Sequence, residues 1–221
     1  MELEPGILIL DAETTGLEQP IGIVEIAWRL LDFSMNLLSK YDTLVNPEMD
    51  IPADATAVHG IRNEDVIGMP TIDKVFFPEC PVVLVCHNII YDKPLVEEYL
   101  NIDRELCSML TARRLLQDVS NHKLVTLAAE LELSRTIPHR APSDVLVLHD
   151  LINYLLEGLG WNFMQLLEFY EKPFVFKTMP IGRHKGRPCS EVPRPYWYWV
   201  LGEEFDRDMR LSAEYYLRKE K

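Results

Sequence analysis

The pattern of apolar residues in the first half of the chain predicts the strands of a sheet. Ile7 to Leu10 and Val82 to Cys86 are uninterrupted apolar runs, which are typical of strands buried on both faces. Ile21 to Leu31 and Leu37 to Val45 are rich in strand-forming residues, and the polar turn between them predicts a meander. Leu106 to Ser108 is a candidate for a further short strand.

Helical patterns begin after these first strands. The segments that show them are Asp54 to Val58, Asn63 to Ile67, Asp92 to Leu100, Leu110 to Leu116, Leu124 to Leu131 and Pro142 to Leu156. Pro142 stands near the first position of the last segment, where proline is tolerated, and Val145, Leu148 and Ile152 share one face of it. Three strands followed by strands that alternate with helices predict an α/β fold with a mixed central sheet flanked by helices.

The amino-acid composition of the sequence changes near Glu171. Residues 173–199 contain five prolines and six aromatic side chains, a density that a disordered tail would not carry. We therefore expect a main domain over residues 1–170 and a small basic and aromatic module over residues 171–221, built as a hairpin followed by a helix.

Charge separates the same two parts. The 221 residues carry a formal net charge of −13. Residues 1–171 contribute −17 to it, whereas residues 172–221 contribute +4. An acidic balance of this size argues against a protein that coats DNA or an anionic membrane through bulk charge.

The sequence also indicates the cellular compartment of the protein. The first residues include acids where a signal peptide needs bases, and no apolar stretch reaches the ~18 residues of a membrane span. The four cysteines form no Cys-x-x-Cys pair, so their spacing predicts neither a zinc site nor a disulfide framework. We expect a cytoplasmic protein with reduced cysteines and no membrane partner.

Two carboxylates, Asp11 and Glu13, directly follow the first predicted strand. Side chains at i and i+2 of an extended segment share a face, so the two charges repel each other unless a cation lies between them. Carboxylate oxygens favour Mg²⁺ or Mn²⁺. The alternative interpretation is a solvated turn after a strand.

The next residues suit a nucleotide or phosphate. Thr14, Thr15 and Gly16 offer hydroxyls, backbone N–H groups and a flexible position. Leu17 follows as an apolar residue that we expect to be exposed at the edge of this site.

A second candidate cluster follows the strand predicted at Val82 to Cys86. It contains His87, Asn88 and Asp92. Ligands of open α/β sheets gather at strand ends, and a carboxylate in the first turn of a helix is favoured by the helix dipole. Asp92 as a plain helix cap is the equally weighted alternative.

A third candidate pair is His139 and Asp144. Prolines at 138 and 142 bracket His139, which places it in a loop and Asp144 in the first turn of the long helix. A loop histidine that titrates near neutral pH can act as a general base.

Taken together, these residues resemble a known family. Asp11-x-Glu13-Thr-Thr-Gly, His87-Asn88-x-x-x-Asp92 and His139-x-x-x-x-Asp144 stand in the order and context of the three motifs of the DEDDh (DnaQ-like) 3′→5′ exonucleases. The resemblance extends over about residues 5–157. Each motif alone is weak, but three in the right order and context are a strong signal.

The resemblance implies a ribonuclease H-like fold and a two-metal nuclease. By this likeness Asp11, Glu13, Asp92 and Asp144 hold two Mg²⁺ ions, for which Mn²⁺ can substitute, and His139 deprotonates the attacking water. The expected product is a 5′-nucleoside monophosphate released from the 3′ end.

The same resemblance implies a set of substrate contacts. Pro52-x-Asp54-Ala-x-x-x-His59-Gly60-Ile61 is similar to the segment that lines the family's substrate groove. The residues expected to contact the terminal nucleotide are Thr14, Thr15, Gly16, Leu17, His59, Gly60, Ile61, His87 and Asn88.

The C-terminal segment is similar to a module found in a deoxyribonuclease branch of the family. The likeness lies in a basic glycine turn, Ile181 to Gly186, followed by Pro195-Tyr-Trp-Tyr-Trp199; Arg183-His184 departs from the usual turn sequence. The basic residues expected to hold upstream phosphates are Lys177, Arg183, Lys185 and Arg187. Alternatively, the aromatic residues form a small core of their own and the charges are solvated.

The leading hypothesis is a 3′→5′ exonuclease that acts on single-stranded or duplex DNA 3′ ends in DNA repair or recombination. A 3′→5′ exoribonuclease or oligoribonuclease of the same superfamily is the nearest alternative, because the 2′-OH is recognised by details of the pocket. A catalytically silent nucleic-acid-binding subunit is the alternative of another class.

Overall fold

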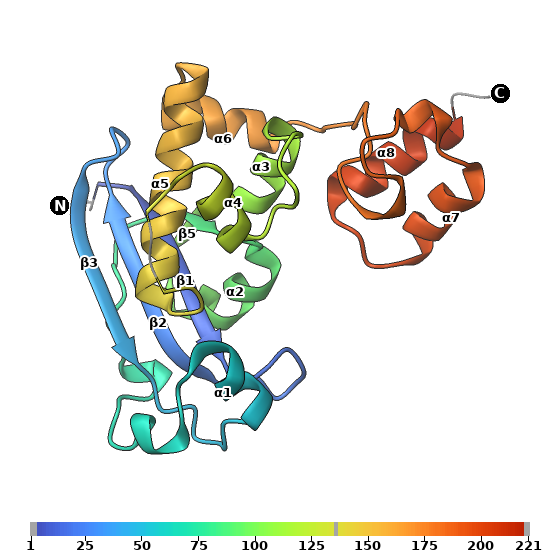
Figure 1. The fold of residues 1–221 in the computed structure, drawn as a ribbon. Coiled ribbons are helices and arrows are strands. Elements are labelled where there is room, and N and C mark those ends of the chain that lie inside the picture. Colours follow the sequence, from blue (N-terminus) through green and yellow to red (C-terminus); the bar gives the residue numbers. More distant parts are fainter. Residues whose placement is uncertain (1–3, 135–136, 219–221) are drawn as a thin grey trace.

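The computed structural model describes residues 4–134 and 137–218, and its centre is a five-stranded mixed sheet (Figure 1). The strands are β1 (Gly6–Thr14), β2 (Ile23–Leu31), β3 (Leu37–Leu44), β4 (Val82–Cys86) and β5 (Ile102–Cys107). Their order across the sheet is β3-β2-β1-β4-β5. The pairs β3-β2 and β2-β1 are antiparallel, whereas β1-β4 and β4-β5 are parallel. The predicted meander and mixed sheet are therefore confirmed.

The central strands of the sheet are apolar up to Asp11 of β1. The first five residues of β1 and all five of β4 are buried, because helices cover both faces of these strands. From Asp11 onward β1 is only partly buried. Because β1 and β4 are parallel, their carboxyl ends lie at the same edge, and polar residues that follow them are brought together.

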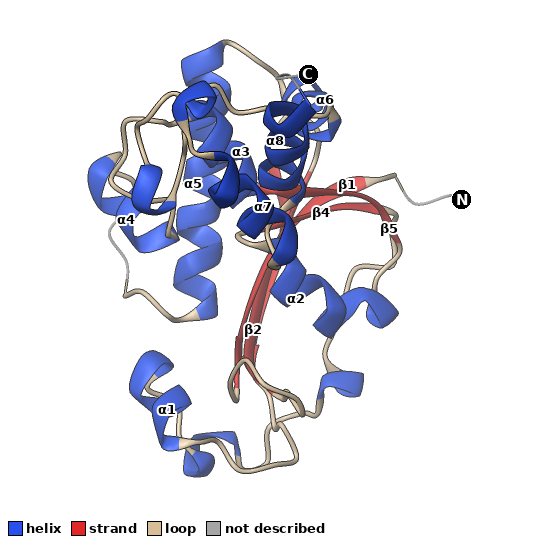
Figure 2. Ribbon diagram, turned by 90° about the vertical axis from the view of Figure 1, so that its right-hand side faces the viewer, coloured by secondary structure: helices blue, strands red, loops and turns tan. Residues whose placement is uncertain are grey.

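The described residues contain eight α-helices. They are α1 (Ala53–His59), α2 (Ile89–Val96), α3 (Ser108–Leu115), α4 (Leu124–Glu130), α5 (Ala141–Leu159), α6 (Phe163–Glu171), α7 (Arg194–Gly202) and α8 (Arg207–Arg218). Helices α1 to α6 belong to the same body as the sheet, whereas α7 and α8 lie in the C-terminal module (Figure 1). The long helix α5 packs on β1 and β2 with α4 beside it, and α2 packs on β4 from the opposite side (Figure 2). No helix among the described residues is both long and apolar enough to cross a membrane.

The helix α5 begins and ends where its sequence indicates. A proline occupies its first turn, and Gly160 terminates it in the left-handed conformation at φ 64°. The buried stripe includes Val145, Leu148 and Ile152, as the periodicity predicts. This packing fixes Asp144, in the first turn, close to the carboxyl ends of the central strands.

Residues beyond α6 form a second hydrophobic cluster with α7 and α8 (Figure 1). Phe176, Met209 and Trp197 are fully or almost fully buried within it. The predicted hairpin is reduced to a single bridge between Thr178 and Pro188, with one 3-10 turn between them and a second directly after Pro188. Residues 219–221 of the predicted module lie outside the described residues.

A buried ion pair docks this module onto the body. Nε and Nη2 of Arg114, on α3, donate to the two carboxylate oxygens of Asp208, on α8, over 2.6 and 2.8 Å. Both side chains are fully buried. The guanidinium also lies 5.0 Å from the ring centroid of Phe174 and donates to the Phe169 carbonyl. Arg113 pairs with Asp206 beside it. The module is therefore held in a defined position on the body.

Several boundaries differ from the sequence-based expectation. The helix predicted from Asp92 begins at Ile89, because Asn88 adopts the left-handed conformation at φ 79° and turns the chain directly into the helix. The strand predicted at Leu106 to Ser108 begins earlier and is β5. No helix was expected at α6 or α8, although Asn162 and Gln165 form a capping box at the start of α6.

The ion pair between Arg114 and Asp208 makes a prediction about stability. Arg114→Met removes the two short hydrogen bonds to the buried Asp208 carboxylate, leaving only Arg207 at 3.6 Å, and should lower the free energy of unfolding by about 3–5 kcal/mol. The double variant Arg114→Met/Asp208→Leu should recover most of that loss. Urea titration of the full chain measures both effects.

The matched control is Arg218→Met, because Arg218 pairs with Glu214 at the surface and should contribute less than about 1 kcal/mol. A cost for Arg114→Met as small as that of the control would show that the buried pair does not hold the module.

Candidate active site

The end of β1 places two of the predicted carboxylates next to a third. Asp11 and Glu13 stand on β1 opposite Ala27 and Glu25 of β2. Asp92, in the first turn of α2, accepts a hydrogen bond from the Ala12 backbone N–H over 3.3 Å. The parallel pairing of β1 and β4 thus brings Asp92 against β1 across 80 residues of sequence.

The start of α5 supplies the fourth carboxylate and the histidine. The His139 backbone N–H donates to Oδ2 of Asp144 over 3.0 Å. His139 has φ 59°, a left-handed conformation for a residue with a side chain, and its imidazole is exposed. Potential ligand atoms of Glu13, His139 and Asp144 all lie within 4.8 Å of one another. The three sequence motifs therefore meet in one place.

Burial raises the pKa of all four carboxylates, and the charges of neighbouring carboxylates add to the shift at Asp11 and Glu13. Burial, followed by the charges of Asp92, Asp144 and Glu13, holds the pKa of Asp11 well above its usual range. Burial is also the main cause that raises the pKa of Glu13 to about 7 and that of Asp92 to about 7.

The pKa of Asp144 is raised by burial as well, although the His139 N–H and charge oppose the shift. The positive charges nearby, His139 and Arg140, therefore do not offset the burial of these carboxyl groups.

The donor set fits divalent cations. Carboxylate oxygens are the ligands that hard cations prefer, and a bound cation would return these groups to their ionised forms. Asp11, Glu13, Asp92 and Asp144 are the residues that would hold such ions.

A neighbouring ion pair was missed from the sequence. Glu25 is buried and accepts hydrogen bonds from the Arg140 guanidinium and from the Ala141 N–H. Arg140 lowers the pKa of Glu13, opposing the dominant effect of burial. An acid inside the apolar run Ile23 to Ala27, and a base directly after His139, were the available signals. The pair anchors the loop of His139 to β2.

A cavity of about 360 Å³ opens beside Asp11, Glu13 and Asp92. Its other lining residues are Ala12, Thr14, Gly16, Leu17, Ile21, Ala55, Val58, His59, His87, Asn88, Tyr91 and Leu95. Leu17 is 74% exposed at the rim, as expected. The cavity is mostly apolar, with the carboxylates along one side. Tyr91, Val58 and Leu95 were not predicted as part of it.

Other predicted contacts lie on or just behind the wall of this cavity. The His59 Nδ1 accepts from the Ile61 N–H. Burial lowers the pKa of His59, although the Thr14 carbonyl opposes this shift. Gly60 ends α1 in the left-handed conformation, and Ile61 is buried in a small cluster beneath it. The Thr15 hydroxyl accepts from the Gly22 N–H. Ile61 and Thr15 thus shape the wall from behind.

His87 lines the cavity, but both of its ring nitrogens are already used. Nδ1 lies 2.8 Å from the Ser108 hydroxyl, and Nε2 lies 2.8 Å from the His122 carbonyl. Burial lowers the pKa of His87 to about 4. The imidazole is therefore neutral near pH 7 and held in one orientation.

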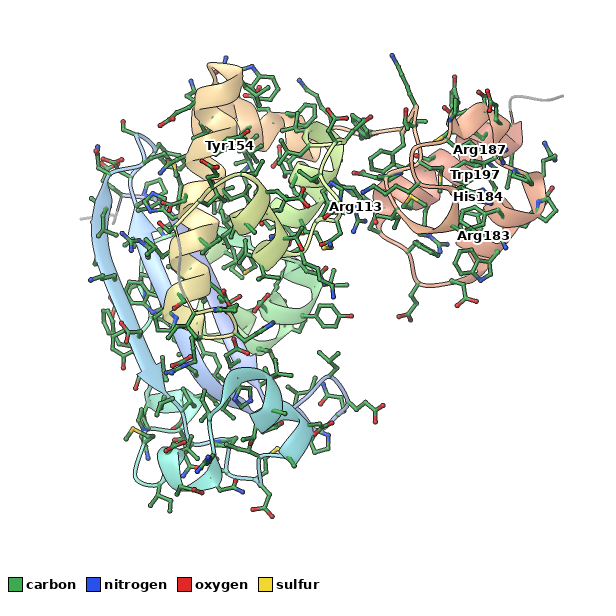
Figure 3. The ribbon with its side chains drawn as sticks, viewed as in Figure 1. Arg113, Tyr154, Arg183, His184, Arg187 and Trp197 are labelled. Carbon is green, nitrogen blue, oxygen red and sulfur yellow. The ribbon has the colours of Figure 1, made fainter. Side chains whose placement is uncertain are left out.

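The basic residues predicted to bind phosphates lie on the module rather than beside the carboxylates. Figure 3 shows Arg183 and Arg187 there, and Arg113 reaching from α3 toward the module. Lys177, Arg183 and Arg187 are exposed. The Lys185 ammonium instead donates to the Val119 and Ser120 carbonyls of the body. Lys185 therefore contacts the body in this structure, and its expected contact with a phosphate stays a prediction.

Comparisons with known proteins agree with this geometry. The exonuclease family model RNase_T matches residues 8–152. Exodeoxyribonuclease 10 of Escherichia coli K12 is 26% identical over 220 residues, covering 95% of this chain and 97% of that protein. An exonuclease of Escherichia phage 186, CP81, is 31% identical over 183 residues, covering 71% of this chain and 91% of its own.

Among solved structures, Exonuclease X in complex with 5′ overhanging duplex DNA superimposes with a TM-score of 0.60 at 27% identity. The match covers 74% of this chain and 99% of that one. The sheet order and flanking helices are those of the ribonuclease H-like exonucleases, which confirms the predicted fold class.

The raised carboxylate pKa values make a prediction about stability without divalent ions. Between about pH 4.5 and 7 the native state holds more protons on Glu13 and Asp92 than the unfolded chain does. Stability should therefore fall as the pH rises through this window. Asp11→Asn replaces a carboxyl whose ionisation is opposed by burial and by its neighbours with an amide that cannot ionise, so it should raise the melting temperature at pH 7.5 in chelator by about 2–8 °C.

Thermal melts of both proteins in chelator at pH 5 and pH 7.5 measure this difference. Comparing the two proteins cancels the contributions of other carboxylates, such as Glu171, whose pKa is lowered chiefly by the Arg104 hydrogen bond. A wild-type protein as stable as Asp11→Asn at pH 7.5 would rule out repulsion within the cluster.

Proposed function

The chain belongs to the DEDDh (DnaQ-like) exonuclease family, and from this premise we propose that it hydrolyses DNA from the 3′ end with Mg²⁺ ions as cofactors. The observation that carries the proposal is the convergence of Asp11, Glu13, Asp92 and Asp144, from three distant segments, beside His139. The expected product is a 5′-nucleoside monophosphate. Mn²⁺ is expected to substitute for Mg²⁺.

The residues of the cluster have different roles in the proposed hydrolysis. Two divalent ions, when bound, supply positive charge to the scissile phosphate and lower the pKa of the attacking water. His139 accepts the proton of that water, for which its exposed imidazole on a loop is suitably placed. Asp144 orients His139 through the backbone N–H, and Arg140 anchors the same loop to Glu25.

The apolar cavity suits the last nucleotide of the strand. Leu17 and Val58 are exposed on one side, and Tyr91 is exposed at the start of α2. A base placed between such side chains loses water and gains stacking contact. His59 lines the same cavity and is a candidate contact for the sugar or base.

Two observations favour DNA over RNA as the substrate. A relative similar over nearly the whole chain is named an exodeoxyribonuclease, and a similar solved structure contains duplex DNA. The module that extends beyond the family match adds exposed Lys177, Arg183 and Arg187, which can contact upstream phosphates. Trp199 is 47% exposed beside Arg183 in a shallow cavity of the module and can stack on an unpaired base.

The cellular setting is part of the same proposal. All four cysteines are buried free thiols, which suits a reducing cytoplasm. Removal of nucleotides from DNA 3′ ends is a step that DNA repair and recombination require.

Asp11→Ala tests the proposed activity most simply. It removes a carboxylate from the centre of the cluster, so hydrolysis of 5′-labelled single-stranded DNA in Mg²⁺ should fall by at least about 1000-fold, as should the wild-type rate in chelator. The measurement is product length on a sequencing gel, with RNA of the same sequence in parallel.

Activity that survives both the substitution and the chelator would contradict the metal-dependent mechanism. Faster degradation of RNA than of DNA would overturn the assignment of substrate.

Leu17→Ala tests the apolar rim. Loss of the exposed side chain should raise KM for duplex ends by about 5- to 30-fold, since one buried leucine contributes about 1–2 kcal/mol, with metal affinity unchanged. Leu38→Ala, at an exposed position on β3, is the matched control. Equal KM values for the two variants would show that Leu17 does not contact the substrate.

A further inference from the structure

The C-terminal module touches a loop that leads to the active site. Nζ of Lys185 donates to the Val119 carbonyl over 2.6 Å and to the Ser120 carbonyl over 2.5 Å. Both carbonyls belong to the connection between α3 and α4, which lies on the side of the body nearest the module (Figure 1). One ammonium group therefore holds two consecutive carbonyls across the boundary between module and body.

The same loop reaches the wall of the catalytic cavity two residues later. The His122 carbonyl lies 2.8 Å from Nε2 of His87. The His122 ring is itself buried and contacts the Leu116 carbonyl over 2.9 Å, which ties the two ends of the loop together. Because the two ends of the loop are held together, a displacement at Val119 or Ser120 should also displace the His122 carbonyl.

This contact fixes the tautomer of His87. A carbonyl oxygen can only accept, so Nε2 of His87 must carry the proton and Nδ1 must accept from the Ser108 hydroxyl. The tautomer and the ring orientation therefore depend on where the His122 carbonyl lies.

His87 in turn sets the position of a carboxylate. It is the residue that follows β4, and Asn88 after it adopts φ 79° to start α2. Asp92 lies in the first turn of that helix and contacts β1. A change in the position of the His87 ring therefore shifts the turn at Asn88, and with it the position of Asp92 relative to the other carboxylates.

We propose that Lys185 is a positioning residue for catalysis, acting through the loop 116–123 and His87 on the start of α2. The module thus helps to position active-site residues, in addition to its exposed basic residues that can contact the DNA strand. This inference rests on the proposed exonuclease function, but its structural part concerns His87 alone. It differs from the sequence-based expectation that Lys185 binds upstream phosphates.

The two roles of Lys185 predict different kinetics. A phosphate contact matters only for substrates long enough to reach the module, and its loss weakens binding in a salt-dependent manner. A positioning contact matters for every substrate, including one that fills only the catalytic cavity. Substrate length and salt therefore distinguish the two.

The test compares Lys185→Met with Lys172→Met, which removes the same charge from an exposed position outside the loop contact. Rates are measured in Mg²⁺ on a dinucleotide and on a 20-residue single strand, at 50 and 200 mM salt. For Lys185→Met we expect kcat to fall by about 2- to 30-fold on both substrates, as for couplings through packed contacts. Salt dependence should match the control, and Lys185→Arg should restore part of the rate.

A second readout is independent of activity. The ¹⁵N shifts of the His87 ring should report the Nε2–H tautomer in the wild type and in Lys172→Met, and a mixture of tautomers in Lys185→Met. A loss confined to the long substrate, or unchanged His87 shifts in Lys185→Met, would overturn the proposal. Altered His87 shifts in a protein that cleaves no nucleic acid would contradict the proposed function and leave the positioning role supported.

Discussion

The burial of four carboxylates beside one another, around the end of β1, is the constraint around which this molecule is organised. Asp11, Glu13, Asp92 and Asp144 come from three segments and are held partly or fully out of water. Holding charges in this way costs stability, which the wholly apolar centre of β1 and β4 offsets. The arrangement makes physical sense as a binding site for divalent cations, because cations remove the repulsion and are themselves useful for phosphate chemistry.

The surrounding structure supports this cluster from three directions. Parallel pairing of β1 with β4 brings Asp92 to β1. Packing of α5 on β1 and β2 brings Asp144, and the buried pair of Glu25 with Arg140 secures the loop before it. The third support is the C-terminal module, fixed by Arg114 and Asp208 and connected through Lys185 to the loop behind His87. The module is thereby part of the catalytic framework.

Local sequence patterns predicted what local physics determines. The run Val82 to Cys86 is the strand β4, and Pro142 lies in the first turn of α5, because apolar runs and proline restrict the backbone on their own. The start of α2 was misplaced, because the left-handed conformation of Asn88 depends on its tertiary setting. Glu25 and Arg140 were missed as a pair, and so was the contact of Lys185 with Val119, because contacts across 115 and 66 residues leave no local pattern.

The central claim is that the clustered carboxylates bind divalent cations at the expense of their own protons. Calorimetric titration of the full chain with Mn²⁺, in buffers of different ionisation enthalpy, measures ions bound and protons released together. With the pKa values of Glu13 and Asp92 both about 7, each carboxyl is about three-quarters protonated at pH 6.5. We therefore expect two ions per chain and release of about 1.5 protons from these two groups at pH 6.5, with fewer released as the pH rises above 7. No Mn²⁺ binding, or binding without any proton release at pH 6.5, would contradict it.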